Sequence, residues 1–199
     1  MTRRATAMRN QPDLFRPPLP EGFEHRLDFL ERDEEATLLE SLRGLPFAEA
    51  EYKEWRAKRR IVSYGGRYDF GSQALEPAPP VPPLLLPLRD RVASLAGLPA
   101  SAFTHAVVTE YAPGAQLGWH RDVPTFEVVA GVSLAGWARM RFRPYPPRGR
   151  RRAAAHIDLA PRSAYVMTGP ARWHWQHAIS PTKELRYSIT FRTLREPPR

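Results

Sequence analysis

The hydrophobic pattern of the N-terminal half predicts two short amphipathic helices. Their apolar positions are Leu38, Leu39 and Leu42 in the first, and Leu85, Leu88, Val92 and Leu95 in the second. Asp33 is expected to cap the first helix, and Gly44 is expected to end it. The second helix has Pro87 in its first turn, where the missing N–H costs little, and ends at Gly97.

From residue 103 onward the pattern changes to short alternating stretches separated by turn residues. The expected strands span 104–111, 117–121, 128–135, 138–143, 155–159, 164–168, 173–178 and 185–194. Many short strands with regular turns are typical of a sandwich or a barrel. Two helices followed by about eight strands therefore predict an α+β, mainly β fold with a jelly-roll core at 103–195.

Between the predicted helices, residues 47–72 alternate aromatic and basic side chains, with a turn signal at Gly65 and Gly66. Residues 1–22 are rich in Arg and Pro and are expected to form a flexible tail. A chain of 199 residues fits one folding unit. We therefore expect a single domain over 23–199, in which helices and a lid at 23–102 precede the jelly roll.

The chain contains no cysteine, which excludes disulfides, thiolate metal sites and cysteine nucleophiles. Any metal must therefore be bound by His, Asp or Glu. No run approaches the roughly 20 apolar residues that span a bilayer, and the basic segment 1–9 is not followed by the apolar stretch of a secretory signal. We expect a soluble, cytoplasmic, monomeric protein that does not associate with membranes.

Basic residues exceed acidic ones, 30 against 21, which gives a formal net charge of +9. This balance favours a polyanionic partner, chiefly nucleic acid, although an arginine-rich codon bias would produce it as well. The clustered basic residues are Arg56, Lys58, Arg59 and Arg60, near Trp55, Tyr64 and Tyr68, and Arg141, Arg143, Arg148, Arg150, Arg151 and Arg152. We interpret Trp137, Trp173 and Trp175 as core residues.

The segment Trp119-His120-Arg121-Asp122 carries a candidate metal site. Side chains two residues apart in a strand point to the same side, so His120 and Asp122 can reach one ion. Candidates for a third ligand are His105, His156, His174 and His177. Two His and one carboxylate form the facial triad of non-haem Fe(II) oxygenases, which leaves positions open for a chelating cosubstrate and dioxygen.

An isolated His-x-Asp is common, and the C-terminal strand strengthens its interpretation as a metal site. Arg186 and Arg192 are six residues apart, so both guanidinium groups face one side of a strand. Two inward-facing Arg are costly unless they meet anions. A planar guanidinium suits a carboxylate, and two such groups suit a dicarboxylate. A sheet edge with both Arg in solvent is the alternative.

Four segments occur in the order and spacing of one known family. They are Tyr111-Ala-Pro-Gly-Ala-Gln-Leu-Gly-Trp-His120-Arg-Asp122, Gly131-Val-Ser-Leu134, Gly169-Pro-Ala-Arg-Trp-His-Trp-Gln-His177-Ala-Ile and Arg186-Tyr-Ser-Ile-Thr-Phe-Arg192. Together they resemble the AlkB-like family of Fe(II)- and 2-oxoglutarate-dependent dioxygenases over roughly residues 45–194. The resemblance implies a double-stranded β-helix and oxidative dealkylation of alkylated nucleobases in DNA or RNA, with release of succinate, carbon dioxide and formaldehyde.

The resemblance also implies roles for individual residues. The implied iron ligands are His120, Asp122 and His177. Arg186 would pair with the distal carboxylate of 2-oxoglutarate, helped by Tyr111, and Arg192 would lie near the carboxylate that chelates iron. Thr109 and Ser188 stand where the family often has Asn, and each hydroxyl can still hydrogen-bond to the cosubstrate.

The segment from Arg60 to Phe70 corresponds to the nucleotide-recognition lid of the family. The residues expected near a flipped base are Arg60, Tyr64, Tyr68 and Phe70. Repair members of the family place an acidic residue soon after the metal-binding Asp, but here Val123 and Pro124 follow, and the nearest acid is Glu127. The identity of the base and the choice between DNA and RNA therefore stay open.

Three functional hypotheses follow from the sequence. The first is an enzyme that dealkylates nucleic acid. The second is a related 2-oxoglutarate-dependent hydroxylase or demethylase that acts on protein or on a small molecule. The third is a non-catalytic nucleic-acid-binding module, which the triad and the two Arg argue against.

Overall fold

The structure is a computed structural model and describes residues 18–196 apart from positions 53–54, 70, 73 and 148–153. Its strands are β1 (Phe23–Arg26), β2 (Ala48–Tyr52), β3 (Trp55–Tyr64), β4 (Arg67–Asp69), β5 (Ala74–Glu76), β6 (Phe103–Tyr111), β7 (Leu117–His120), β8 (Phe126–Leu134), β9 (Ala138–Pro144), β10 (Ala155–Leu159), β11 (Ala164–Met167), β12 (Trp175–Ile179) and β13 (Arg186–Leu194). Its helices are α1 (Arg32–Arg43), α2 (Leu86–Ala96) and α3 (Gly169–Trp173), with 3-10 turns at Pro83–Leu85 and Ala100–Ala102.

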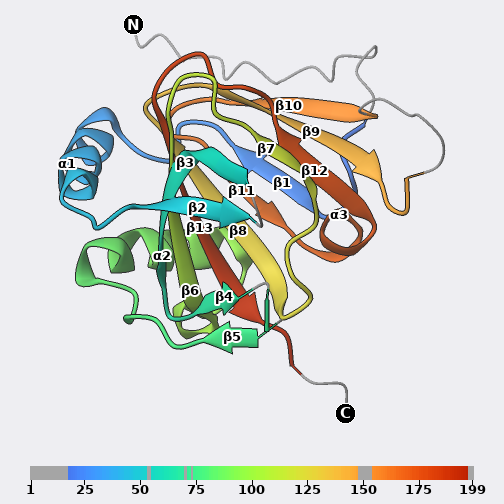
Figure 1. Cartoon of the computed structure of the whole chain (residues 1–199), viewed down its shortest axis with the longest axis horizontal. Helices are drawn as coiled ribbons and strands as arrows, with labels where there is room; N and C mark the ends of the chain where they lie inside the picture. The colour runs from blue at the N-terminus through green and yellow to red at the C-terminus, as the bar shows by residue number, and fades with distance from the viewer. Residues whose placement is uncertain (1–17, 53–54, 70, 73, 148–153, 197–199) are drawn as a thin grey trace, which may run out of the picture.

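Two antiparallel sheets form the core (Figure 1). The major sheet has the strand order β1-β11-β8-β13-β6-β3-β2, and the minor sheet has the order β10-β9-β12-β7. Apolar side chains from both sheets meet between them, among them Val129 and Met167 from the major sheet and Met140 and Phe142 from the minor sheet. The predicted jelly-roll core is confirmed.

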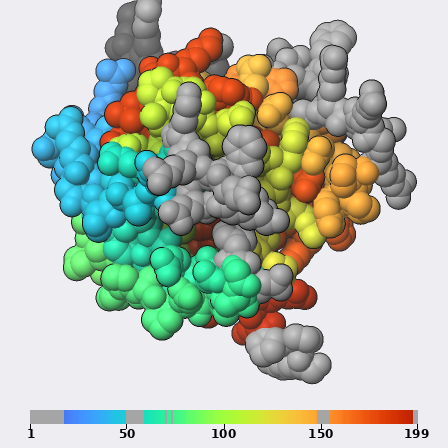
Figure 2. All heavy atoms as spheres, viewed as in Figure 1, coloured from blue at the N-terminus to red at the C-terminus, as the bar shows by residue number. Residues whose placement is uncertain are grey.

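The two longer helices cover the outer face of the major sheet. Leu42 of α1 and Val92 of α2 are buried in one cluster with Val108 and Ile189 of the sheet. In the space-filling view, α1 (blue) and the β9–β10 hairpin (orange) lie on opposite sides of the molecule (Figure 2). Among the described residues, no helix is long and apolar enough to cross a membrane.

The ends of the helices agree with the sequence except at the first cap. The predicted cap at Asp33 is wrong: the helix begins at Arg32 after Glu31, because the backbone N–H of Glu31 donates to the carboxylate of Glu34 at 2.8 Å. The second helix ends as expected, since Gly97 adopts the left-handed conformation with φ +66° that terminates helices.

The eight strands predicted after residue 103 all occur, with one shifted start. Residues 169–173 form α3, so the strand expected at 173–178 begins only at Trp175. The interpretation of Trp137 as a core residue is wrong, because its side chain is 56% exposed. Strands β1, β2 and β3 from the N-terminal segment join the major sheet, and the predicted domain boundaries stay a prediction.

Candidate metal and cosubstrate site

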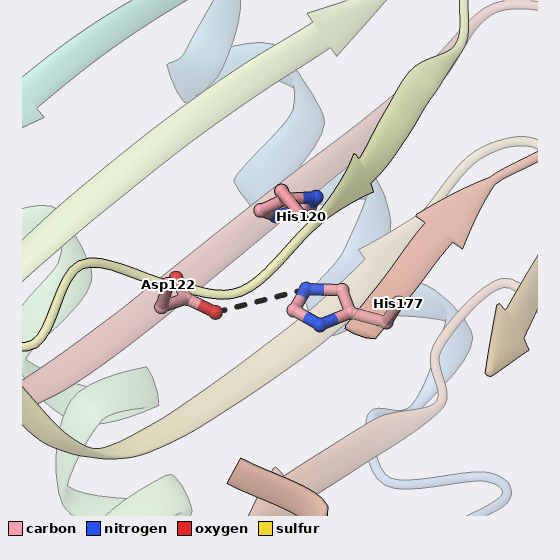
Figure 3. Close-up of side chains that lie close together, drawn as sticks. All are labelled: His120, Asp122 and His177. Carbon is pink, nitrogen blue, oxygen red and sulfur yellow. Dashed lines mark ion pairs between the residues drawn. The ribbon is translucent and has the colours of Figure 1, made fainter. Parts of the chain in front are cut away.

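Two histidines face each other across neighbouring strands of the minor sheet. His120 ends β7 and lies directly opposite His177 of β12 in the antiparallel register. The ring centroids are 4.2 Å apart and the ring planes are inclined by 57°. Asp122 follows β7 by two residues and directs its carboxylate at the His177 ring (Figure 3).

The three side chains converge closely enough to hold one metal ion. Each offers one ligand atom, and these atoms lie within 4.8 Å of one another. The Oδ2 atom of Asp122 is 3.6 Å from Nε2 of His177. This oxygen is buried and has no hydrogen-bond partner among the described atoms, an arrangement that is costly for a carboxylate unless a cation meets it. The donor set of two imidazoles and one carboxylate suits Fe(II).

The hydrogen bond of His120 leaves one of its ring nitrogens free to bind a metal. Nδ1 of His120 is 2.9 Å from the carbonyl oxygen of Gly118, which can only accept, so Nδ1 carries the hydrogen and Nε2 keeps its lone pair. Burial lowers the pKa of His120. Burial, assisted by His120, lowers the pKa of His177 to about 3. Both rings are therefore neutral near pH 7, as metal coordination requires.

Asp122 is ionised because its cationic neighbours outweigh its burial. Burial alone would raise its pKa, but the charge of Arg192, with a smaller contribution from Arg172, holds the pKa well below its usual range. Nε and Nη2 of Arg192 both lie 3.0 Å from Oδ1 of Asp122. Arg192 thus connects the major sheet to the carboxylate and leaves Oδ2 directed toward the histidines.

Arg186 is the second guanidinium on this face and is the largest fully buried side chain. Its Nε donates to Oγ of Ser133 at 3.0 Å, and its Cζ lies 5.0 Å from the centre of the Tyr111 ring. Its Nη1 is buried without a hydrogen-bond partner among the described atoms. A buried cation with an unused donor is costly in isolation and fits a site that receives a carboxylate.

Hydroxyl groups line the sheet between the two guanidinium groups. Thr109 of β6, Ser188 of β13 and Ser133 of β8 are directly opposite one another in the register, and all three are buried. Thr190, the next residue of β13 on the same face, accepts a hydrogen bond from Arg192 at 3.3 Å. The face of the major sheet between Arg186 and Arg192 is therefore polar, as the binding of a dicarboxylate would require.

A comparison of sequences decides the family. Residues 29–192 match the profile of the 2OG-Fe(II) oxygenase superfamily. The chain belongs to this superfamily. Membership identifies it as a dioxygenase and confirms the predicted cofactors, Fe(II) and the cosubstrate 2-oxoglutarate.

Relatives and solved structures agree with this assignment. The oxygenase is 27% identical over 197 residues to the uncharacterized protein L905 of Acanthamoeba polyphaga mimivirus, covering 87% of this chain and 85% of that protein. It is 26% identical over 176 residues to the tRNA (carboxymethyluridine(34)-5-O)-methyltransferase alkbh8 of Xenopus tropicalis, covering 86% of this chain but only 27% of that protein.

The fold is also that of known oxygenases. The structure of OsALKBH1 matches with a TM-score of 0.68 and 17% identity, covering 86% of this chain and 96% of that one. The prolyl hydroxylase of Trichoplax adhaerens, solved with a hypoxia-inducible-factor peptide, matches with a TM-score of 0.57 and 15% identity, covering 87% and 83% of the two chains. The oxygenase thus has an AlkB-like fold, as the sequence motifs predicted.

None of the other three candidate histidines belongs to the triad, and each has different surroundings. His105 is buried edge-on against Phe126 and has Nδ1 at 2.9 Å from the hydroxyl of Thr104. His174 is exposed at the end of α3. His156 lies in β10 opposite Arg141. Of the four alternatives, the structure brings only His177 to His120 and Asp122.

The residues expected to recognise a base are not brought together at the triad. Arg60 pairs with both carboxylate oxygens of Glu110, at 2.8 and 3.0 Å. Tyr64 is 7% exposed and packs in the cluster between the helices and the major sheet. Tyr68 lies in the small β4–β5 sheet. Phe70 lies outside the described residues.

Arg59 was predicted only as a member of the basic cluster, and the sequence did not indicate that it lies beside the metal and cosubstrate site. It lies opposite Tyr111 in the register of β3 and β6, on the face of the major sheet that Arg186 occupies. Its Nε is buried without a hydrogen-bond partner among the described atoms, and its charge contributes to lowering the pKa of His120, after burial. Strand alternation separates it from Arg60, which points to the opposite face.

A second set of missed residues supports the segment after Asp122. Nη2 of Arg172 donates to the carbonyl oxygens of Val123 and Phe126, each at 2.7 Å. Nη1 of Arg121 donates to the carbonyl oxygen of Trp173 at 2.9 Å. Helix α3 therefore holds the loop that carries Asp122. Both contacts join residues about 50 positions apart, which local patterns do not reveal.

The second basic cluster is only partly described. Arg141 and Arg143 of β9 lie over the ring of Trp119, with Cζ at 5.1 and 4.6 Å from its centre. Arg143 also donates from Nε to Gln176 at 2.7 Å. The remaining members, at positions 148 and 150–152, lie outside the described residues.

Proposed function

We propose that the oxygenase oxidatively dealkylates alkylated nucleobases in DNA or RNA. In this proposal the metal ligands are His120, Asp122 and His177. The distal carboxylate of 2-oxoglutarate is bound by Arg186 with Tyr111, and Thr109, Ser188 and Arg192 complete the cosubstrate site. Tyr68, together with Phe70 of the same segment, stays a proposed contact to nucleic acid, whereas Arg60 is engaged by Glu110.

The observation that carries the proposal is the position of Arg59. Strand β3 extends the major sheet along β6 and presents Arg59 on the face of the triad, with Nε buried and unpaired among the described atoms. A guanidinium can only donate, so it suits a substrate that brings an oxygen acceptor or a negative charge. Nucleobase carbonyls and phosphates are such acceptors. The net charge of +9 favours the same partner.

The name of one relative supports a nucleic-acid substrate. The alkbh8 protein of Xenopus tropicalis is named as a methyltransferase of tRNA, and the match spans 27% of its length. Glu127, the acid nearest to Asp122 in the sequence that follows it, accepts a hydrogen bond from the indole of Trp173 at 3.0 Å and lies 3.7 Å from Arg195. Because Glu127 already has these partners, it is not free to accept a hydrogen bond from an amino group of a base. The donor at this edge is Arg59, which favours bases with a carbonyl oxygen beside the alkyl group.

The residues of the chain have positioning roles in the proposed reaction. Held by the triad and by Arg186, iron and 2-oxoglutarate would supply the oxidising chemistry: dioxygen would hydroxylate an N-methyl carbon while 2-oxoglutarate became succinate and carbon dioxide, and the hydroxylated carbon would be lost as formaldehyde. Arg192 keeps Asp122 ionised and oriented. Gly118 fixes the tautomer of His120. Arg186 anchors the cosubstrate in a buried position from which water is excluded. No general base is needed from the protein.

A hydroxylase or demethylase of protein or of a small molecule is the second candidate. The observation that favours it is the burial of Tyr64 between the helices and the sheet, which removes a predicted base-stacking side chain from the site. The two candidates predict different substrates for the same triad. A panel of methylated RNA, DNA and peptides separates them.

The test measures succinate release with each member of the panel and identifies the modified nucleosides by mass spectrometry. The proposal expects succinate release above the uncoupled background only with alkylated nucleic acid, together with loss of the alkyl mark. Stimulation by peptides alone would overturn the substrate assignment. Separately, anaerobic addition of Fe(II) and 2-oxoglutarate should produce a weak visible charge-transfer band, and its absence would contradict the proposed cosubstrate site.

A further inference from the structure

Tyr165 lies flat across its neighbouring strand. It belongs to β11 and pairs with Gly131 of β8. A Cβ atom added to Gly131 would be 2.4 Å from Cζ and 2.6 Å from the hydroxyl oxygen of Tyr165, far inside contact distance. The tip of the phenol therefore occupies the space that any other residue at 131 would fill. A glycine is required here by close approach.

This arrangement places the hydroxyl over the centre of the cosubstrate site. Gly131 pairs on its other side with Thr190 of β13. Thr190 lies between Ser188 and Arg192 on the same face of that strand. The phenol therefore extends from β11 toward β13, to the row midway between the Arg186 end of the site and the Asp122 end.

The electrostatic surroundings of the phenol agree with this position. Burial raises the pKa of Tyr165, and Asp122, Arg186, Tyr111 and Arg192 all contribute further shifts. Charged groups from both ends of the site therefore act on one hydroxyl. A tyrosine hydroxyl keeps its hydrogen near pH 7, and the raised pKa favours this form further, so the hydroxyl can donate to an anion.

Aromatic packing holds the ring in place. Phe23 of β1 stacks on Tyr165 with centroids 5.8 Å apart and an angle of 19° between the planes. Phe23 in turn contacts Phe142 of the minor sheet edge-on, at 4.9 Å. With Phe23 on the ring and Gly131 beneath its tip, the phenol has little freedom to move, so it can define the shape of the site.

We propose that Tyr165, seated on Gly131, is a cosubstrate-contacting residue whose hydroxyl donates to 2-oxoglutarate and whose ring limits the site to a five-carbon dicarboxylate. The inference rests on the proposed placement of the cosubstrate between Arg186 and the triad. It does not depend on the identity of the substrate that is oxidised.

The hydroxyl is tested with a single-atom change. The full chain is loaded with Mn(II), which such sites bind without turnover, and 2-oxoglutarate is titrated by calorimetry. Tyr165→Phe keeps the ring and should weaken 2-oxoglutarate binding about tenfold, as expected for a lost hydrogen bond to a charged group. The matched control is Tyr187→Phe, whose hydroxyl bonds to Glu110 at 2.9 Å on the opposite face of β13, and it should leave the affinity unchanged.

The ring is tested with a change of volume. Tyr165→Val should open the site and raise the affinity for the six-carbon homologue 2-oxoadipate relative to 2-oxoglutarate by about tenfold. Gly131→Ala should lower the melting temperature and 2-oxoglutarate affinity of the wild type. In the Tyr165→Val background, the same change should have little effect on the melting temperature, because the atom it would meet is gone.

The outcomes separate this inference from the proposed function. If the wild type fails to bind 2-oxoglutarate in the presence of Mn(II), the proposed cosubstrate site fails. If the wild type binds it, but Tyr165→Phe behaves like Tyr187→Phe and Tyr165→Val leaves the ratio of the two dicarboxylates unchanged, the inference about Tyr165 is overturned alone.

Discussion

The metal end of the site, whose histidines lie on the minor sheet, and the proposed substrate edge, which lies on the major sheet, differ in how their side chains are held. At the metal end, Arg192 holds Asp122 and Gly118 holds His120 before any ligand binds. At the edge, Arg59 of β3 has an unpaired Nε among the described atoms. In the proposed function, the metal end is therefore organised by the fold itself, and a substrate would complete the edge.

The largest expected effect is at the metal end. His177→Ala removes one of three converging ligand atoms and should lower the affinity for Fe(II) or Mn(II) by roughly 100-fold or more, because even supporting residues cost 10–100-fold. His174→Ala, three residues earlier and exposed, is the control and should bind metal normally. Calorimetric titration with Mn(II) measures both. Loss of metal binding in the His174 variant instead would reassign the third ligand.

The next largest effect is expected at the buried Arg186, where loss of the charge should weaken cosubstrate binding without lowering the stability of the ligand-free protein. Arg186→Met removes an incompletely paired buried guanidinium and should keep or raise the melting temperature of the ligand-free protein. The same change should weaken 2-oxoglutarate binding about ten- to 100-fold. Thermal unfolding with and without 2-oxoglutarate and Mn(II) measures both quantities.

The control for this prediction is a surface arginine. Arg139→Met removes the exposed ion pair with Asp158, at 2.7 Å, and should leave the cosubstrate affinity unchanged. A strong loss of stability in the ligand-free Arg186 variant would show that the guanidinium mainly supports the fold.

Adjacent arginines at the substrate edge provide a matched pair. Arg59→Ala should weaken the binding of nucleic acid about tenfold and reduce its dependence on salt, because Arg59 faces the triad. Arg60→Ala should leave this binding nearly unchanged, because its guanidinium is paired with Glu110 on the opposite face. Fluorescence anisotropy with a labelled oligonucleotide at several salt concentrations measures both variants. Equal effects at the two positions would mean that the strand contributes only general positive charge.

The sequence predicted the parts of the site that depend on local periodicity. The two-residue repeat of strands places Arg186 with Arg192 on a common face. The same repeat predicted that His120 and Asp122 reach one ion, and they do converge, although Asp122 lies beyond the end of β7. The same rule separates Arg59 from Arg60, but it does not say which of the two faces the site. That choice depends on the register of β3 against β6, which is set by contacts far apart in the sequence.

Other features lay beyond local patterns for the same reason. The spacing alone left four candidate histidines for the third ligand, and only the cross-strand pairing of β7 with β12 distinguishes His177 in space. The contact between Tyr165 and Gly131 joins β11 to β8, and no sequence motif predicts that these two strands pair. Helix α3 has five residues, too few for a helical period to be recognised.

The smallest expected effect tests whether Arg60 is a structural residue. The hydrogen bond from Arg60 lowers the pKa of Glu110, with a further contribution from Tyr187. A carboxyl with a lowered pKa stabilises the fold above its unfolded pKa of about 4.3, and this contribution is lost as the pH falls through the folded pKa. Glu110→Gln should therefore lower the melting temperature by at most a few degrees at pH 7, and the difference from the wild type should shrink as the pH falls below about 4.3 and vanish once the pH is below the lowered folded pKa.

Glu40→Gln is the control for this last prediction, because Glu40 pairs with Arg43 at 2.6 Å on the open surface of α1. Water screens that pair, so its removal should leave the melting temperature unchanged at both pH values. Melting curves followed by circular dichroism compare the three proteins. If the deficit of Glu110→Gln persisted undiminished at low pH, the ion pair with Arg60 would not be its cause. Arg60 would then be free to serve the substrate edge, and the contrast with Arg59 would disappear.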